Sequence, residues 1–311
     1  MTGQPASLTD PAAPLDIPAA WRRLPLDDLR GLLIVIGGVD VGKSTFARYL
    51  FDQLQQIALP AAFLDGDPGQ SALGPPTTMT ISPSPPAGRA GEAVISPSAS
   101  PGRMSPRRWF VGSTTPVHHM LPLLTGAARL SRFAFESGAA AVVYDTSGFI
   151  DPSAGGVALK HAKLDLLQPA AVFALQHSDE LEPLLAPLRR SQRFPLYELR
   201  PSPAVRPRSP EVRRQRRIQR FRRYFTGAQT YSLGWNQLPV FPAPFYRRNR
   251  LLAIEDSAGF TLALGIIVDL DRPARRLALL TPHPHPEQAN ALRLGDILID
   301  PGSFEHERMD Q

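Results

Sequence analysis

One stretch constrains the fold of this chain more than any other: Gly37-Gly38-Val39-Asp40-Val41-Gly42-Lys43-Ser44-Thr45. It fits the pattern G-x-x-x-x-G-K-[ST] and lies between an apolar run at 31–36 and an amphipathic segment at 43–57. Glycines let backbone N–H groups turn inward around phosphate oxygens, and the start of the following helix adds its dipole. Lys43 supplies a positive charge for nucleotide β- and γ-phosphates, and Ser44 can bind Mg²⁺. The stretch predicts a strand–loop–helix unit that binds phosphates.

Strand-like and helix-like runs alternate beyond this unit. Apolar runs typical of buried strands occur at 31–36, 61–65, 76–81, 108–112, 139–145, 170–175 and 195–199. Segments with a helical pattern occur at 43–57, 117–137, 156–167 and 178–189. The alternation predicts an α/β fold with a mainly parallel sheet flanked by helices. Short β-like runs follow at 251–254, 259–268, 276–281 and 296–299, and they predict a small all-β module over 228–311.

The positive charge of the chain is concentrated in one segment. The formal net charge is +6, and only three basic residues are lysine. Segment 206–223 carries one glutamate and nine arginines, so it holds +8 and leaves −2 for the rest. The arginines are Arg206, Arg208, Arg213, Arg214, Arg216, Arg217, Arg220, Arg222 and Arg223. A solvated helix face is one interpretation, but like charges at i, i+4 repel, and a local polyanion site explains the segment better.

Composition removes several other classes of protein. Cysteine is absent, which excludes disulfides and thiolate metal sites, and the histidines lack metal-type spacing. The first twenty residues show no secretory signal, and no apolar run is long enough to span a membrane, so we expect a cytoplasmic protein without membrane contact. Residues 1–30 are expected to be irregular, and the proline-rich stretch 82–107 to be a loop or an insertion.

Three further stretches follow predicted strands, where ligands bind in a sheet of this type. Asp65 and Asp67 lie in Leu64-Asp-Gly-Asp-Pro-Gly-Gln70 and suit metal or proton-transfer chemistry, although a plain turn has the same composition. Asp145 ends the run 139–145, as a Walker-B carboxylate does, and D-x-x-G also resembles a GTPase switch. The stretch 112–116 (GSTTP) suits a phosphate contact or simple helix capping.

Together these stretches resemble the P-loop polynucleotide 5′-hydroxyl kinase family, which includes a pre-mRNA cleavage cofactor, a nucleolar rRNA-processing kinase and archaeal kinases. The similar stretches, in family order, are GGVDVGKSTFARYL (37–50), FLDGDPGQS (63–71), FVGSTTP (110–116), YDTSGFI (144–150), LKHAKLDLLQPAAVFALQ (159–176) and AVRPRSPEVRRQRRIQRFRRYFTG (204–227). The resemblance implies a P-loop NTPase fold over 31–227, with a basic lid at 204–227. It also implies ATP and Mg²⁺ as cofactors and transfer of the γ-phosphate to the 5′-hydroxyl of RNA or DNA.

By position, the resemblance assigns the phosphate-binding loop Gly37–Thr45 to ATP, with Lys43 on the β- and γ-phosphates. Ser44 and Asp65 would serve the metal, with Gln70 beside them. Asp67 would exchange a proton with the 5′-hydroxyl.

The resemblance also implies that Arg208 and Arg213 close over the phosphates as lid arginines. Thr114, Thr115, Thr146 and Phe149 match positions that hold the nucleic-acid strand.

Two departures separate this chain from the family pattern. Many members carry Thr-Pro-Gly-Trp where this chain has Thr146-Ser147-Gly148-Phe149, so base stacking would rest on a smaller ring. The eukaryotic members have a folded N-terminal domain, whereas only about 30 residues precede the first predicted strand here, so adenine contacts made from that domain must be replaced or missing.

An ATP-binding scaffold subunit of an RNA-processing complex is the main alternative function. A GTPase is disfavoured because no N-K-x-D motif occurs, and a small-molecule kinase because a small substrate leaves the outer arginines nothing to bind.

Overall fold

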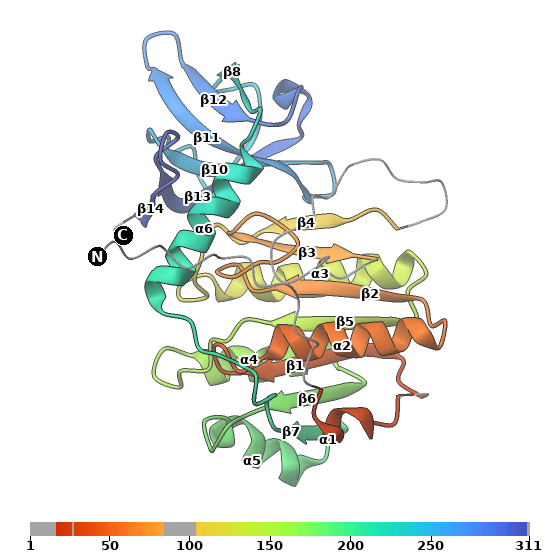
Figure 1. Ribbon diagram of the computed structural model, residues 1–311. Helices are drawn as coiled ribbons and strands as arrows, with labels where there is room; N and C mark the ends of the chain where they lie inside the picture. The colour runs from red at the N-terminus through yellow and green to blue at the C-terminus, as the bar shows by residue number, and fades with distance from the viewer. Residues whose placement is uncertain (1–16, 27, 84–103, 310–311) are drawn as a thin grey trace, which may run out of the picture.

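The computed structural model describes residues 17–26, 28–83 and 104–309, and two β-sheets organise this part of the chain (Figure 1). The first sheet has seven strands in the order β4-β3-β2-β5-β1-β6-β7. Its strands are β1 (Gly31–Gly37), β2 (Ala61–Gly66), β3 (Thr78–Ser82), β4 (Arg107–Phe110), β5 (Ala141–Thr146), β6 (Ala171–Leu175) and β7 (Leu196–Leu199). All its pairings are parallel except β2–β3 and β3–β4. The predicted α/β fold with a mainly parallel sheet is confirmed.

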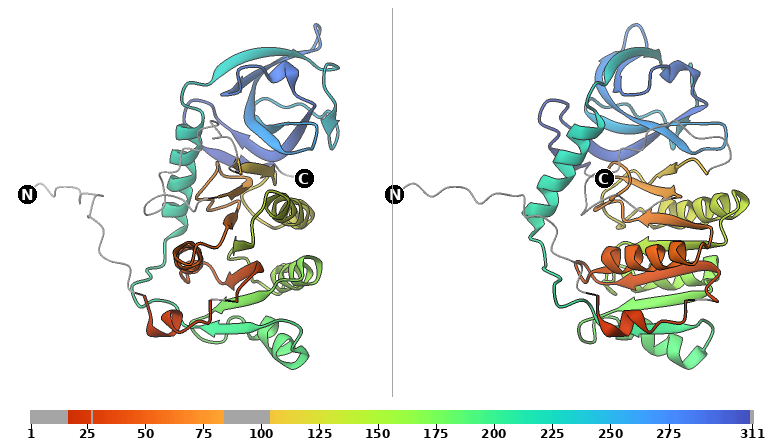
Figure 2. Two further views of the ribbon diagram at one scale, coloured as in Figure 1. Left: turned by 90° about the vertical axis from the view of Figure 1, so that its right-hand side faces the viewer. Right: turned by 45° about the vertical axis from the view of Figure 1, so that its right-hand side comes forward.

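Helices cover both faces of this sheet, as Figure 2 shows end-on. The short α1 (Ala19–Arg22) and α2 (Lys43–Gln56) lie on one face. The other face carries α3 (Met120–Glu136), α4 (Gly156–Leu167) and α5 (Glu182–Ser191). Each face has its own apolar core, because alternate side chains of the buried strands point to opposite sides. The two cores fix β1, β2 and β5, whose carboxyl ends carry the polar residues discussed below.

Part of the N-terminal stretch expected to be irregular is built into the core. Trp21 on α1 is fully buried, with its ring 5.0 Å from that of Phe46 and 5.8 Å from that of Tyr49. Its indole N–H donates to the carbonyl of Arg200 at 3.2 Å. A single aromatic residue in a Pro/Ala-rich stretch gives no periodic pattern, so the sequence offered no sign of this packing. Residues 1–16, and most of the loop predicted at 82–107, lie outside the described residues.

The second sheet, also of seven strands, confirms the predicted all-β character of the C-terminal region. Its strands are β8 (Gln229–Gly234), β9 (Val240–Phe241), β10 (Arg250–Glu255), β11 (Thr261–Asp271), β12 (Arg276–Thr281), β13 (Ala291–Ile299) and β14 (His306–Arg308), with a short 3-10 helix at Pro286–Gln288. The order is β14-β13-β10-β11-β12-β8, antiparallel throughout, and β9 pairs in parallel with β13. We call this region, residues 228–309, the C-terminal module. It lies beyond the β4 edge of the first sheet (Figure 1).

Helix α6 (Pro210–Tyr224) carries most of the basic segment and runs from the first sheet to the C-terminal module (Figure 1). Ser209 caps its start by accepting a hydrogen bond from the Val212 N–H at 3.2 Å, and Pro210 takes the first helical position. On its apolar side Phe221 is fully buried against the module, with the exposed arginines around it. Ile218 and Phe225 are buried on the same side, so one face of the helix packs while the arginines occupy the rest.

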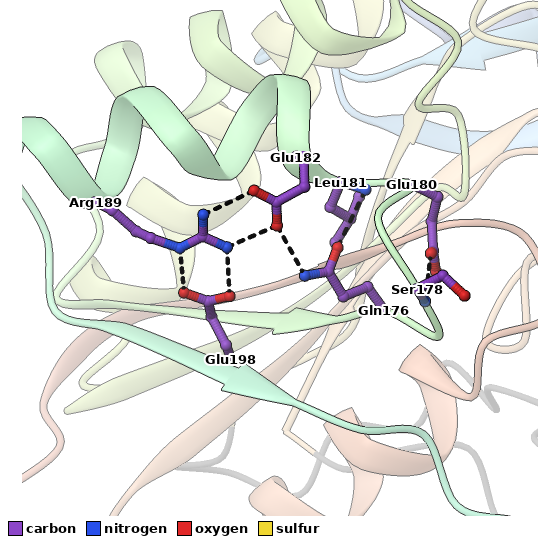
Figure 3. A network of polar contacts seen from close by, with 7 residues as sticks. All are labelled: Gln176, Ser178, Glu180, Leu181, Glu182, Arg189 and Glu198. Carbon is purple, nitrogen blue, oxygen red and sulfur yellow. Dashed lines mark hydrogen bonds and ion pairs between the residues drawn. The ribbon is translucent and has the colours of Figure 1, made fainter.

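The edge of the first sheet farthest from the module is held by a polar network (Figure 3). Arg189 on α5 contacts Glu198 on β7 and Glu182 at 2.7 Å each, and Gln176 after β6 donates to Glu182 at 3.2 Å. The network fastens α5 to the edge strand.

In the described part of the chain no helix has the length and apolarity to cross a bilayer. The location predicted from the sequence stays a prediction.

Candidate active site

The phosphate-binding loop adopts the predicted strand–loop–helix arrangement between β1 and α2. Lys43, the first residue of α2, is 7% exposed, and its ammonium donates to the carbonyl of Gly38 within the loop. Burial lowers the pKa of Lys43, while the negative charges of Asp145, Asp67 and Asp40 act in the opposite direction. Because charges interact more strongly away from water, this buried ammonium is well placed to stabilise nucleotide phosphates.

Asp145, at the end of β5, is the carboxylate best placed for a metal ion. It is 5% exposed, and Ser44 donates a hydrogen bond to it. Its Oδ1 is buried and has no hydrogen-bond partner among the described residues. Burial raises the pKa of Asp145 to about 7, and the neighbouring Lys43 opposes the rise. A hydroxyl and an unpaired carboxylate oxygen suit Mg²⁺, which binds one or two protein oxygens together with substrate phosphates.

Asp65, which the resemblance assigned to the metal, has a structural task instead at one of its oxygens. Its Oδ2 accepts hydrogen bonds from Ser71 Oγ at 2.9 Å, Ala72 N at 2.6 Å and Leu73 N at 2.8 Å. Burial raises the pKa of Asp65, and these hydrogen bonds oppose the rise. The side chain therefore shapes the turn at 71–73. No group of three or more metal-ligating side chains gathers anywhere in residues 17–26, 28–83 and 104–309.

A cleft of about 480 Å³ is lined by seven of the residues that the sequence singled out. From the predicted set it is lined by Val39, Asp67, Gln70, Thr114, Thr115, Phe149 and Arg213. It also contains Ser147 and Gly148, which lie between Thr146 and Phe149 in the loop that the resemblance assigns to the nucleic-acid strand. Five further lining residues had no predicted individual role: Gly69, Pro116, Ile150, Asp151 and Arg217. Val39 is the one lining residue from the phosphate-binding loop, and Lys43, Ser44, Asp65, Thr146 and Arg208 are not among the lining residues. The cleft thus joins the phosphate-binding loop, the loops after β2, β4 and β5, and helix α6.

Two glycines allow these loops to meet. A Cβ added to Gly148 would lie 2.7 Å from Cα of Val39, and one added to Gly69 would lie 2.5 Å from the carbonyl oxygen of Thr114. Neither glycine has space for a side chain without moving backbone. Asp67 sits beside this contact, and its Oδ1 accepts from the N–H groups of Gly69 at 2.9 Å and Gln70 at 3.1 Å. These bonds hold the carboxylate in one orientation.

Arg208 and Arg213, which the resemblance assigns to a lid, contact the phosphate-binding loop directly. Asp40 adopts a left-handed conformation (φ 55°), and its Oδ2 accepts from the backbone N–H of Arg208 and from Arg213 Nη1, both at 3.0 Å. Arg208 Nη1 also lies 3.4 Å from Gln70 Oε1. Arg213 is 25% exposed and Arg208 39% exposed, so both retain donors that reach solvent. The start of α6 is therefore fixed over the loop, as a lid requires.

Arg217 lies one helical turn beyond Arg213 and also lines the cleft. Nothing in the sequence separates it from the other arginines of the basic segment. Its Nε donates to Nε2 of His306 at 3.1 Å. Burial lowers the pKa of His306 to about 4, with the nearby Arg217 charge adding to the effect. His306 is therefore neutral at neutral pH and can accept this hydrogen bond. The histidine comes from β14, so only the fold brings the two together.

Both remaining lysines lie beneath the cleft on α4. Lys160 Nζ donates to Thr146 Oγ1 at 2.8 Å and to the carbonyl of Ser147 at 2.6 Å. Lys163 Nζ donates to the hydroxyl of Tyr144 at 2.7 Å. Burial lowers the pKa of Lys160 well below its ordinary value and that of Lys163 to about 8. The signal that could have found them is their rarity, since the chain has only three lysines and all three are buried here.

Thr146, predicted to hold the substrate strand, is 1% exposed and lies beneath the loop rather than in the cleft. Its Oγ1 donates to the carbonyl of Val35 at 2.8 Å and accepts from Lys160. The hydroxyl therefore ties β5 to β1 and α4. Phe149, three residues later, does line the cleft.

Residues 37–227 match the sequence profile of the family described as mRNA cleavage and polyadenylation factor CLP1 P-loop. The match spans more than half of the chain and includes every segment that lines the cleft. This chain belongs to that family. The resemblance found in the sequence is thereby confirmed at the level of the family.

Curated relatives include archaeal proteins named polyribonucleotide 5′-hydroxyl-kinase. The one from Methanocaldococcus jannaschii is 29% identical over 223 residues, which are 72% of this chain and 58% of the relative. The one from Pyrococcus furiosus is 31% identical over 209 residues, which are 67% of this chain and 54% of the relative. The chain thus spans little more than half the length of these relatives.

Solved structures show the same fold at low sequence identity. The Clp1p structure in complex with Pcf11p (454–563) has a TM-score of 0.65 at 15% identity, covering 92% of this chain and 76% of the other. A second Clp1p–Pcf11p structure, which concerns ATP loss in a Gly135Arg mutant, has a TM-score of 0.64 at 14% identity, covering 86% and 75%. The coverage of this chain extends the fold match into the C-terminal module.

Proposed function

We propose that this protein is an ATP-dependent polynucleotide 5′-hydroxyl kinase that transfers the γ-phosphoryl group of ATP to the 5′-hydroxyl of RNA or DNA. The observation that carries the proposal is a cleft in which Val39 of the phosphate-binding loop meets Asp67, Thr114, Phe149 and Arg213. A phosphate donor and a hydroxyl acceptor can meet there beside a carboxylate. The names of the curated archaeal relatives support the same activity.

At the donor end, ATP bound with Mg²⁺ supplies the phosphoryl group. Ser44 and Asp145 have the donor atoms to hold the metal ion, because a hydroxyl and a carboxylate are ligands of the kind it prefers. Lys43 supplies positive charge from a buried position, and Arg213 reaches the same region from α6. Phosphoryl transfer proceeds through a loose transition state, so positioning and neutralisation of charge account for most of the catalysis.

At the acceptor end, Asp67 is the group that accepts the proton of the attacking hydroxyl. Its Oδ1 is occupied by two backbone N–H groups, which fixes the direction of the carboxylate. Thr114 and Thr115 line the cleft, where their polar groups can bind the nucleic-acid strand. Phe149 presents a ring on which a base can stack.

Labelled-phosphate transfer tests this proposal and distinguishes the acceptors. The purified protein is incubated with γ-labelled ATP, Mg²⁺ and matched RNA or DNA oligomers that end in a 5′-hydroxyl or a 5′-phosphate. We expect label only on 5′-hydroxyl oligomers, removable by phosphatase, and abolished by EDTA. ATP that remains bound through purification with no transfer to any oligomer would contradict the proposal and favour an ATP-binding scaffold. Competition with unlabelled GTP tests the choice of nucleotide.

A further inference from the structure

The loop that carries Thr114 and Thr115 is fastened to the C-terminal module at both of its ends. We call residues 112–119 the acceptor loop. At its start, the carbonyl of Gly112 accepts a hydrogen bond from the backbone N–H of Asp296 at 2.8 Å. At its end, Nε2 of His119 lies 3.0 Å from Asp296 Oδ2. One residue of β13 therefore holds both ends of an eight-residue loop.

The contact between the acceptor loop and β13 is tightly packed. A Cβ added to Gly295 would lie 2.8 Å from the Phe110 ring and 2.9 Å from the carbonyl oxygen of Gly112. His119 is 6% exposed and precedes the first residue of α3. Because the backbones touch here, movement of β13 must displace the acceptor loop as well.

Asp296 is itself held by a buried arginine of the module. Arg250 is 5% exposed, and its Nη2 lies 3.3 Å from Asp296 Oδ1. Its other nitrogens donate to the carbonyls of Gly295 at 2.7 Å and Phe245 at 2.6 Å. The guanidinium thus links β10, β13 and the residues around Phe245. It holds the Asp296 carboxylate in one orientation toward the acceptor loop.

The acceptor loop reaches the reacting region directly. Thr114 and Thr115 line the cleft, and the carbonyl of Thr114 packs against Gly69, two residues from Asp67. Within the loop, the Thr115 N–H donates to Ser113 Oγ and the Val117 N–H to Thr115 Oγ1, both at 3.3 Å. These bonds are local and cannot by themselves set the position of the loop relative to Asp67. The start of the loop is tied to the first sheet, because the Gly112 N–H donates to the carbonyl of Thr77 at 3.4 Å, and the contacts with Asp296 add an anchor from the module at both ends.

We propose that the C-terminal module belongs to the catalytic unit, and that Asp296 is the positioning residue through which it sets the acceptor loop against Asp67. The matched family region ends at residue 227, so nothing in it assigns a role to this module. The proposal rests on the proposed kinase function. Because a displacement of about 1 Å can cost about 100-fold in rate, loosening this contact is expected to affect catalysis from a distance.

The test compares Asp296→Ala and Asp296→Asn with Asp256→Asn as a matched control. Asp256 also joins the module to the first sheet, through an ion pair with Arg107 on β4 at 3.0 Å, but it does not touch the acceptor loop. We expect Asp296→Ala to raise KM for a 5′-hydroxyl oligomer at least tenfold while KM for ATP stays within twofold. Asp296→Asn keeps an acceptor oxygen and should recover part of the loss, and Asp256→Asn should change neither KM.

Hydrogen exchange of residues 112–119 gives a readout that does not depend on activity. We expect faster exchange of this segment in Asp296→Ala, no change at the phosphate-binding loop, and no change at either place in Asp256→Asn. Unchanged exchange at 112–119, or KM values for ATP and oligomer that rise equally, would overturn the proposal. If the wild-type protein transfers no phosphate, the kinase function fails, whereas the exchange result still decides the role of Asp296.

Discussion

At the phosphate end of the cleft one continuous stretch supplies nearly every group, whereas at the acceptor end the groups come from segments far apart in the sequence. Residues 37–45 provide the loop, the ammonium and the hydroxyl, to which Asp145 and Arg213 are added from elsewhere. The acceptor end combines Asp67, the acceptor loop, Phe149 and helix α6, with the C-terminal module behind them. The first end depends on local geometry and the second on the whole fold, so they should respond differently to substitution.

The largest expected effect that separates the two ends comes from Asp67→Asn. The amide keeps an oxygen for the N–H groups of Gly69 and Gln70 but cannot accept the hydroxyl proton, so transfer should fall by about 10²–10⁴-fold. ATP binding should be retained, because the phosphate-binding loop is untouched. Transfer kinetics together with equilibrium ATP binding measure both. A variant that loses ATP affinity in proportion to its rate would contradict the assignment.

The strand–loop–helix structure of the donor end could be predicted because its pattern lies in consecutive residues. The same holds for the strands β1, β2, β5 and β6, whose apolar runs are continuous. The burial of Asp65 and Thr146 was not predictable, since their partners Leu73 and Lys160 are chosen by the fold. The family resemblance implied a metal ligand at Asp65, and the geometry favours Asp145.

At the acceptor end, the position after predicted strands pointed to Asp67 and to 112–116, whereas the roles of Thr146 and Phe149 came through the resemblance to a family. The contacts of Arg217 with His306 and of His119 with Asp296 join residues 89 and 177 positions apart. No periodicity or spacing can reveal such pairs from a single sequence. The burial of Trp21 was missed for a related reason, since one aromatic residue in an irregular stretch carries no pattern.

Arg213→Leu should have the second largest effect and act on the donor end from α6. Removing this charge from Asp40 and from the transferring group is expected to cost about 10²–10³-fold in transfer rate. Arg206→Leu is the matched control, because Arg206 lies in the same segment and donates only to the carbonyls of Pro203 and Val205. Single-turnover rates at saturating ATP measure both variants. Equal losses in the two would mean that overall charge, not the lid contact, is what matters.

Lys163→Met is expected to change the pH dependence of stability by up to about 3 kcal/mol. Burial lowers the pKa of Lys163 to about 8 in the folded protein, against 10.5 when exposed. Between these values the unfolded state binds more protons than the folded state. The free energy of unfolding of the wild-type protein therefore increases as pH rises from about 8 to 10.5. The variant should lack this component of the rise. Denaturant unfolding of both proteins across that range measures it, and parallel curves would show that the lysine is not perturbed.

Phe149→Ala should have the smallest effect and fall on the acceptor end alone. Loss of one stacked base is worth about 1–3 kcal/mol, so KM for the oligomer should rise about tenfold or more while KM for ATP stays the same. Phe149→Trp should lower KM for the oligomer, because a larger ring covers more of the base. Steady-state kinetics with both substrates varied provide the values. A change in KM for ATP instead would place Phe149 at the donor end.

The central claim is that the phosphate-binding loop and the residues of the acceptor end form one phosphoryl-transfer site. A single-turnover time course of label transfer tests this claim most directly. Wild-type protein and Lys43→Ala are compared with labelled ATP and a 5′-hydroxyl RNA oligomer. We expect the wild type to place label at the 5′ end, and the variant to be slower by about 10³-fold or more, since it lacks the buried charge. No 5′ label with the wild type, or equal rates for the two proteins, would contradict the claim.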